Sequence, residues 1–306
     1  MNDETIKAVV GHNSSRTSRA AAAKYEDGKL VMVSPTSGAS NLAREYPNYV
    51  FRTVPPASVY AKSLAERIYG YKNIGGEWLE KIAICYDSQD TYSQSFKNDF
   101  KSNIFQLNSE NPSQPQAQVF DTDCDLSVEQ FNPQEILDQI KSQGADALVL
   151  IASVKTIDKA AEIAKAQGED KLPLFGSTSM YAGKTLEIGE EGVEGMLLII
   201  PWYPHSRQSN QSFLGNAFKL WGGRVSWRTA LAYDATKVII EGLKKSETRE
   251  GLQEAFKSPN FSVDGASGKV KFDEGGDRVE EPQDSVIIRQ RLDSQSGTEY
   301  DFEWRP

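Results

Sequence analysis

The segment IKAVVGHNSSRTSRAAAAKYEDGKLVMVSPTSGAS, residues 6–40, decides the fold of this chain. Two short apolar runs, at 6–10 and 30–33, each end in a turn rich in hydroxyl side chains, and the Ala-rich residues 16–25 between them suit a helix. Short apolar runs that alternate with helical segments indicate parallel strands joined by right-handed crossovers. We therefore expect both turns at the same edge of one sheet, where open α/β sheets bind ligands.

The first turn (residues 11–15) and the second turn (residues 34–40) both carry groups that can bind an anion. We expect each turn to open a helix, whose unpaired N–H groups and positive dipole end attract negative charge. Hydroxyl groups can donate to the same oxygens. A purely structural interpretation stays open, because Ser and Thr are also favoured as helix N-caps. The candidate ligand-binding residues here are Asn13, Ser14, Ser15, Thr36, Ser37 and Gly38.

A second α/β run starts at residue 81 and repeats this pattern, which indicates two similar lobes joined by more than one crossing. Its expected strands also end in hydroxyl-bearing or small residues, at 87–92, 152–154 and 176–179. Such groups make hydrogen bonds but perform little chemistry, and this favours binding over catalysis. Tyr92 could close over a ligand or pack between helices. From residue 206 the pattern is helical, and the tail from 268 predicts antiparallel strands.

Composition narrows the class of partner. The formal charge of −9 argues against a nucleic acid, which needs a basic face. No apolar run approaches the ~18 residues of a membrane-spanning helix. The acidic, polar residues 1–4 are the reverse of a secretory signal.

Enzyme and metal signatures are missing from the sequence. It contains no G-x-S-x-G, H-E-x-x-H, Walker or Rossmann glycine motif. The histidines, His12 and His205, show no metal-ligand spacing, so we expect no cofactor and no metal. A further alternative is a hydrolase that uses Ser15 or His12, but no orienting carboxylate accompanies these residues in the sequence.

The two cysteines, Cys85 and Cys124, leave the compartment open. Cys85 lies in an apolar run and is predicted to be an inert core thiol. Cys124 lies in the acidic stretch 121–125, which is predicted to be a solvated loop. A pairing of the two has no cysteine framework to support it, but stays open.

Five motifs in order and spacing resemble the type I periplasmic binding proteins, in particular the branched-chain amino-acid receptors of ABC transporters. The resemblance covers nearly the whole chain and rests on residues 9–15, 30–37, 49–53, 86–92 and 227–235. It implies two Rossmann-like α/β lobes joined by a multi-strand hinge, with lobe 1 at 1–78 and 203–259 and lobe 2 at 79–202 and 260–306.

In lobe 1, the resemblance assigns roles to three of the candidate residues. Ser15 matches the serine that holds the ligand carboxylate through its hydroxyl and backbone N–H. Thr36 lies where a backbone carbonyl receives the ligand ammonium. Gly38 stands where a threonine binds both groups, so a hydroxyl is lost there.

In lobe 2, Tyr92 matches the tyrosine that covers the ligand, and Ser153 lies near another aromatic position of the family. Thr178 stands where an acid neutralises the ammonium, and Ser179 follows it. An ammonium buried without a carboxylate would be costly, which argues against a simple α-amino acid ligand. Tyr233 belongs to the last motif and completes the candidate set.

The family has two strand–helix units before the one that starts at residue 6. The resemblance therefore implies that lobe 1 is incomplete at its N-terminus and that a β–α–β–α segment and a signal peptide once preceded residue 1.

These expectations add up to a non-catalytic, extracytoplasmic receptor. We expect it to close around a small polar ligand, an amino acid or a related carboxylate or amide, and to deliver it to an ABC-type permease. The alternative is a ligand-sensing domain of a signalling system with the same fold and a signalling partner.

Overall fold

The computed structural model describes residues 3–72, 75–168, 171–204, 206, 210–222, 225–279, 284–293 and 297–305. The chain forms two compact units, which are described separately. Unit 1 comprises Met1–Pro56 and Pro201–Asp284, and unit 2 comprises Ala57–Ile200 and Ser285–Pro306. The chain therefore passes from one unit to the other after residues 56, 200 and 284, which agrees with the expectation of more than one crossing.

Unit 1 is built on a parallel sheet of three described strands in the order β1-β2-β3. Its elements in chain order are β1 (Ala8–Val10), α1 (Ser15–Asp27), β2 (Val31–Ser34), α2 (Leu42–Glu45), β3 (Val50–Arg52), α8 (Gln211–Trp221), α9 (Trp227–Leu243), α10 (Arg249–Lys257), β9 (Val263–Gly265) and β10 (Gly268–Val270). The strands β9 and β10 form a separate antiparallel pair. The parallel pairing of β1 with β2 confirms the prediction from residues 6–40.

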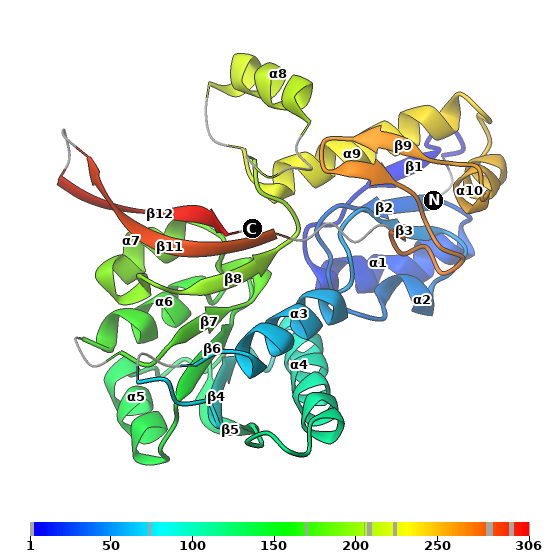
Figure 1. Ribbon diagram of the computed structural model, residues 1–306. Helices are drawn as coiled ribbons and strands as arrows, with labels where there is room; N and C mark the ends of the chain where they lie inside the picture. Colours follow the sequence, from blue (N-terminus) through cyan, green and yellow to red (C-terminus); the bar gives the residue numbers. More distant parts are fainter. Residues whose placement is uncertain are drawn as a thin grey trace. The chain divides into compact units, whose positions relative to one another are not determined.

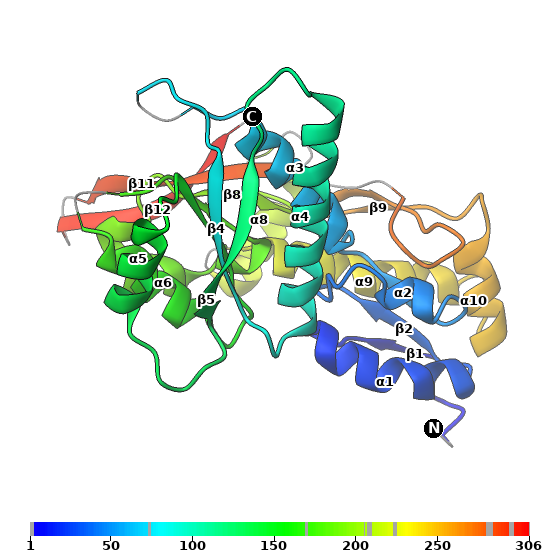
Figure 2. The same cartoon turned by 90° about the horizontal axis from the view of Figure 1, so that it is seen from below.

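The core of unit 1 lies on both faces of this sheet, because successive strand residues point in opposite directions. Val31 and Val33 of β2 pack with buried residues of α9 and α10. Met32, between them, packs on the other face with Ala22 of α1 and Leu42 of α2. Figure 2 shows α1 and α9 on opposite sides of β1 and β2. Unit 1 is thus a three-layer α/β/α unit.

Unit 2 contains a seven-stranded sheet in the order β12-β11-β8-β7-β6-β4-β5. Its elements are α3 (Ala57–Tyr69), β4 (Lys81–Tyr86), α4 (Thr91–Glu110), β5 (Gln118–Asp125), α5 (Pro133–Ser142), β6 (Ala147–Ile151), α6 (Ile157–Ala166), β7 (Leu174–Gly176), the 3-10 helix η1 (Thr178–Met180), α7 (Gly183–Gly189), the 3-10 helix η2 (Glu190–Val193), β8 (Leu197–Ile200), β11 (Asp284–Asp293) and β12 (Gly297–Arg305).

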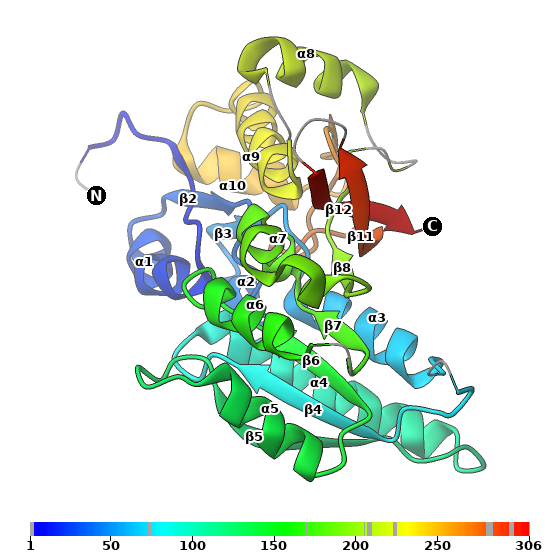
Figure 3. The same ribbon diagram turned by 90° about the vertical axis from the view of Figure 1, so that its left-hand side faces the viewer.

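Helices cover both faces of the unit 2 sheet. Figure 1 shows α3 and α4 on one side and α5, α6 and α7 on the other, and Figure 3 shows α5 and α6 in front of the strands. The strands β4 to β8 are parallel, and every residue of β6 is buried, as expected for a strand covered on both faces. The tail strands β11 and β12 pair antiparallel at the edge of the sheet, as predicted.

The boundaries of the units differ from those expected from the sequence. Residues 57–78 were assigned to lobe 1, but α3 belongs to unit 2, where it packs against α4 and β8. Residues 260–284 were assigned to lobe 2, but they belong to unit 1, where Phe261, Val263 and Phe272 lie in the core below α9 and α10. In both cases packing of apolar side chains, rather than the strand pattern, fixes the boundary. An N-terminal extension of unit 1 stays a prediction.

Two local predictions were wrong. The acidic stretch 121–125 is not a loop, because β5 extends through Asp125. The second turn does not open a helix directly. The short helix α2 starts only at Leu42, with Asn41 as its N-cap residue.

Candidate functional site

The first turn ends at the N-terminus of α1, and Ser14 is the N-cap of this helix. Its hydroxyl accepts a hydrogen bond from the backbone N–H of Thr17 at 3.3 Å and lies 2.7 Å from Thr17 Oγ1. The structural interpretation of a hydroxyl as a cap therefore applies to Ser14. The N-terminus of a helix also carries the positive end of the helix dipole, which favours an anion nearby.

Hydrogen bonds hold the first turn and the second turn side by side, as expected from the sequence. The Thr36 hydroxyl donates to the backbone carbonyl of Asn13 at 2.9 Å. The Ser37 hydroxyl donates to the backbone carbonyl of His12, also at 2.9 Å. We call these two turns, residues 11–15 and 34–40, the two-turn site.

Ser37 stabilises the two-turn site through buried hydrogen bonds. Besides its bond to His12, its hydroxyl lies 2.7 Å from the hydroxyl of Ser18, and both side chains are buried. The Ser34 hydroxyl donates to the same His12 carbonyl at 3.1 Å. A hydroxyl that is satisfied inside the protein contributes to the shape of a site rather than to ligand contact. Gly38 is buried beside Ser37 and carries no side chain.

The buried side chain of Ser15 keeps a hydroxyl hydrogen that it can donate. Its hydroxyl oxygen accepts a hydrogen bond from the backbone N–H of Ala39 at 3.0 Å, which links α1 to the second turn. The hydroxyl hydrogen has no acceptor among the described residues. Because a hydroxyl can accept and donate at once, Ser15 can present its hydrogen to a carboxylate while it holds Ala39.

Sequence reasoning missed Arg52, the last residue of β3. Its side chain is fully buried, and it donates to the backbone carbonyls of Ser37 (3.2 Å), Ala39 (2.6 Å) and Ser40 (2.8 Å). Its Nε donates to Asp277 at 2.5 Å. A charged residue at the end of the apolar run 49–53 was the signal that could have identified it, because a buried arginine requires several acceptors.

Tyr233, the other candidate in unit 1, lies on α9. Its ring packs on Phe213 of α8, with 4.9 Å between the ring centroids, and Lys237 Nζ lies 5.8 Å from the centroid of the Tyr233 ring. The hydrogen bonds that join the two turns do not include Tyr233.

In unit 2, Tyr92 and Thr178 meet although they are far apart in the sequence. Tyr92 lies in the first turn of α4 and Thr178 follows β7, and their hydroxyl oxygens are 2.6 Å apart. Burial raises the pKa of Tyr92 to about 12, against hydrogen bonds from Thr178 and Ser177 that lower it. The phenol is therefore neutral at physiological pH, and this pair offers neutral polar atoms rather than a counter-charge.

Ser153 and Ser179 fix the ends of neighbouring strands. The Ser153 hydroxyl accepts from the backbone N–H of Lys155 at 3.1 Å, in the turn that opens α6. The Ser179 hydroxyl donates to the backbone carbonyl of Ala152 and lies 2.8 Å from the hydroxyl of Ser177. Both candidates are buried. Ser153 stabilises the turn between β6 and α6, and Ser179 connects the end of β7 to the end of β6.

The turn that carries Tyr92 is held from β5. Asp125 accepts hydrogen bonds from the Ser88 hydroxyl, from the Ser88 backbone N–H at 3.1 Å and from the Ser127 backbone N–H at 2.9 Å. Burial raises the pKa of Asp125, but the hydrogen bonds from Ser88 and Ser127 outweigh this effect, and the pKa is lowered overall. Asp125 is thus a charged, well-satisfied acceptor below the Tyr92 turn.

The prediction for Cys85 was wrong. Cys85 of β4 and Cys124 of β5 form a disulfide, and both side chains are fully buried. The pairing of β4 with β5 shifts register between Ile84 and Tyr86, where β5 carries extra residues. The bulge brings Cys124 opposite Cys85, a placement that follows from strand pairing and not from cysteine spacing.

The expectations about metal ligands and membrane-spanning helices can be compared with the described residues only. His205, one of the two histidines considered as ligands, lies outside the described residues. Within the described ranges, no three His, Cys, Asp or Glu side chains are grouped to hold a metal ion. No helix formed by those residues is long and apolar enough to cross a membrane.

Comparison with known proteins agrees with this architecture. The profile of a family described as "Periplasmic binding protein" matches residues 1–289. The leucine-, isoleucine-, valine-, threonine- and alanine-binding protein of Pseudomonas aeruginosa is 24% identical over 282 residues, which cover 90% of this chain and 69% of that protein.

Solved structures share the fold. The leucine binding protein LivK of Thermotoga maritima matches with a TM-score of 0.76 and 23% identity, covering 99% of this chain and 80% of that chain. A solute binding protein of Rhodopseudomonas palustris HaA2, solved in complex with p-hydroxybenzoic acid, matches with a TM-score of 0.73 and 16% identity, covering 98% of this chain and 78% of that chain.

Proposed function

Because the chain belongs to the periplasmic binding protein family, we propose that it is an extracytoplasmic receptor that closes around a small carboxylate and delivers it to an ABC-type permease. Closure follows from differential affinity, since a ligand shifts the equilibrium toward the state that it binds more tightly. The role is binding rather than catalysis.

The observation that carries this proposal is the two-turn site. The N-terminus of α1 and the hydroxyl group of Ser15 lie at the same turn, and both favour an anion. The neighbouring turn is held against them by Thr36 and Ser37. A site fixed in this way needs little ordering when a carboxylate binds, which favours affinity.

The ligand class is narrowed by unit 2. The candidate residues Tyr92 and Thr178 offer a phenol and a hydroxyl, both neutral. Such a pair suits a hydroxyl, an amide or an aromatic edge better than an ammonium, whose burial calls for a carboxylate. The similar proteins that were solved with a ligand include some that hold an amino acid, leucine or isoleucine, and some that hold a hydroxybenzoic acid, which has no ammonium group. We propose a carboxylate without an ammonium group for this chain.

The disulfide supports an extracytoplasmic location. Cys85 and Cys124 are buried and bonded to each other. Such bonds form and persist in oxidising compartments and are rare in the cytosol.

A thermal-shift screen tests the proposal. Benzoate, p-hydroxybenzoate, L-leucine, L-isoleucine and benzamide are compared on the same protein. We expect the carboxylates without an ammonium to stabilise it most, and a ligand at 100 times its Kd adds about 2.7 kcal/mol. Stabilisation by L-leucine but not by benzoate would contradict the ligand class, and no stabilisation by any of the five would contradict the carboxylate receptor.

A further inference from the structure

We infer that Arg52 is a positioning residue of the two-turn site, which sets the backbone of residues 37–40 and through it the orientation of Ser15. The importance of that orientation for a ligand rests on the proposed function. Arg52 itself need not touch the ligand, because its side chain is fully buried.

All three nitrogens of the Arg52 guanidinium donate hydrogen bonds. Nη1 donates to the carbonyls of Ser37 and Ala39, Nη2 donates to Ser40, and Nε donates to Asp277. Three carbonyls within four residues of chain are thus turned toward one planar cation. Only arginine supplies several N–H donors in a fixed fork, so an ammonium cannot reproduce this arrangement.

The same backbone segment reaches Ser15 on its other side. The Ala39 carbonyl accepts a hydrogen bond from Arg52, and the Ala39 N–H donates one to the Ser15 hydroxyl oxygen. With its oxygen occupied in this way, Ser15 has its hydrogen left to donate. Loss of the Arg52 contact would release Ala39, and Ser15 would then lose the partner that orients it.

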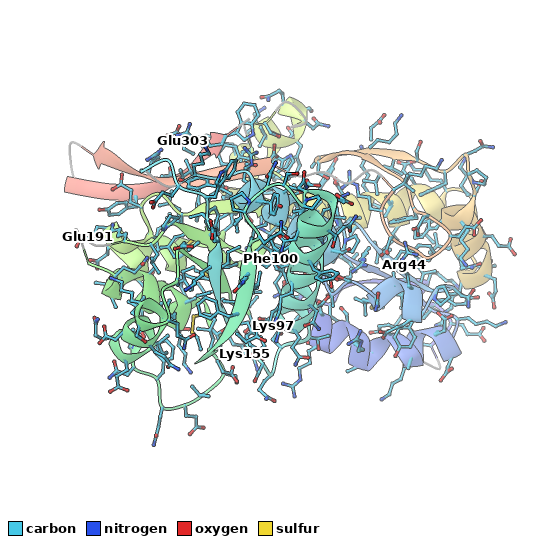
Figure 4. The ribbon with its side chains drawn as sticks, turned by 60° about the horizontal axis from the view of Figure 1, so that its bottom comes forward. Arg44, Lys97, Phe100, Lys155, Glu191 and Glu303 are labelled. Carbon is cyan, nitrogen blue, oxygen red and sulfur yellow. A yellow bond between two sulfur atoms is a disulfide. The ribbon has the colours of Figure 1, made fainter. Side chains whose placement is uncertain are left out.

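Arg52 is in turn fixed by residues distant in the sequence. Its backbone N–H donates to the carbonyl of Gly276 at 3.1 Å, next to the ion pair with Asp277. Arg44 of α2, labelled in Figure 4, places its Nε 3.4 Å from the other oxygen of Asp277. The carboxylate therefore lies between two arginines and limits the movement of Arg52.

Unit 1 contains a matched control in Arg278. It is also buried, lies 3.8 Å from Asp234 and donates to backbone carbonyls, those of Thr53, Ser267 and Lys269. None of these acceptors belongs to the two-turn site. If Arg52 had only a structural role, replacing Arg52 and replacing Arg278 would have the same effect on the two-turn site.

The experiment compares Arg52→Lys with Arg278→Lys. Hydrogen exchange is followed for the backbone N–H groups of Ser37 and Ala39, and binding of benzoate and L-leucine is measured by calorimetry. We expect exchange at both N–H groups to be faster in Arg52→Lys only. For the probe that the wild type binds, affinity should fall about tenfold or more in Arg52→Lys and by less than about twofold in Arg278→Lys.

Equal exchange in the two variants would overturn the inference, and so would wild-type affinity in Arg52→Lys. If the wild-type protein binds neither probe, the ligand class has failed, while the exchange comparison still decides the role of Arg52. Should Arg52→Lys not fold, Asp277→Asn replaces it. That variant keeps an acceptor for Arg52 but removes the charge, and faster exchange at Ala39 is again the supporting result, with unchanged exchange the opposing one.

Discussion

The two units hold their strand-end turns by different means. In unit 1, the buried ion pair of Arg52 with Asp277 holds the two-turn site, and a second buried pair, Arg278 with Asp234, bonds to other parts of the unit. In unit 2, the corresponding turns are held by hydroxyl groups, by the carboxylate of Asp125, which accepts hydrogen bonds from Ser88 and Ser127, and by the disulfide between β4 and β5. Similar hydroxyl-rich turns in a sequence can therefore depend on unrelated interactions in the folded protein.

The difference has energetic consequences. A buried charge is costly when its partner is removed, whereas a neutral hydrogen bond contributes only about 1 kcal/mol. Mutations of the buried ion pairs in unit 1 should therefore affect stability more than mutations of single hydroxyls in unit 2.

Asp234→Ala should cost roughly 3–5 kcal/mol of unfolding free energy, because Arg278 is left buried without its counter-ion. Asp234 also accepts from the backbone N–H groups of Ala266 and Ser267. Asp234→Asn keeps an acceptor for these groups and should cost less. Urea unfolding measures both variants, and equal small losses would show that the ion pair does not stabilise unit 1.

The double variant Cys85→Ala/Cys124→Ala should cost roughly 2–4 kcal/mol, since the bond closes a loop with a sequence separation of 39. The effect should be confined to unit 2. Hydrogen exchange should accelerate in β4 and β5 and stay unchanged in β1 to β3. Faster exchange in both units would mean that the two means of support are not independent.

Ser15→Ala should weaken binding of the carboxylate ligand by roughly 1.5–3 kcal/mol, the range for a hydrogen bond to a charged group. Calorimetry measures the change. Thr248→Ala is the control, because Thr248 also accepts from a backbone N–H at 3.0 Å but caps α10. That variant should lose about 1 kcal/mol of stability and keep its affinity. Unchanged affinity in Ser15→Ala would remove Ser15 from the site.

Tyr92→Phe should cost only about 0.5–1.5 kcal/mol at neutral pH, because it removes one hydrogen bond to Thr178. The pH dependence is more specific. Folding raises the pKa of Tyr92 from 10.0 to about 12, so the neutral phenol favours the folded state. This contribution is complete below pH 10.0 and is lost as the pH rises to about 12.

Denaturant unfolding of wild type and Tyr92→Phe across this pH window tests the sign. The wild type should lose stability that the variant does not lose. Parallel losses in the two proteins would show that Tyr92 titrates with its ordinary pKa in the folded state, and that the neutral pair in unit 2 is not buried.

Much of the fold could be predicted from the sequence. The apolar runs at 6–10, 30–33 and 147–151 are short and end in turns, and they form parallel strands of the two sheets. The side-by-side position of the two turns followed from the same reasoning, because adjacent parallel strands end at one edge. The unit boundaries did not follow, because α3 and residues 260–284 are assigned by the core they pack against.

Less of the candidate site could be predicted. The hydroxyl groups of Ser15, Thr36 and Ser37 were identified from residue type and position alone. Whether each hydroxyl binds a ligand or supports a turn depends on its hydrogen-bond partners, and these are brought together only by folding.

By itself, then, the sequence determined the alternation of strands and helices and the chemistry of the turns, since periodicity and residue type are local properties. Tertiary structure decided that Arg52 meets Asp277, 225 positions away, and that Cys85 meets Cys124 across a bulge. The physical reason is that a buried charge or a disulfide needs a partner at a defined distance and orientation, and no local pattern in the chain specifies either.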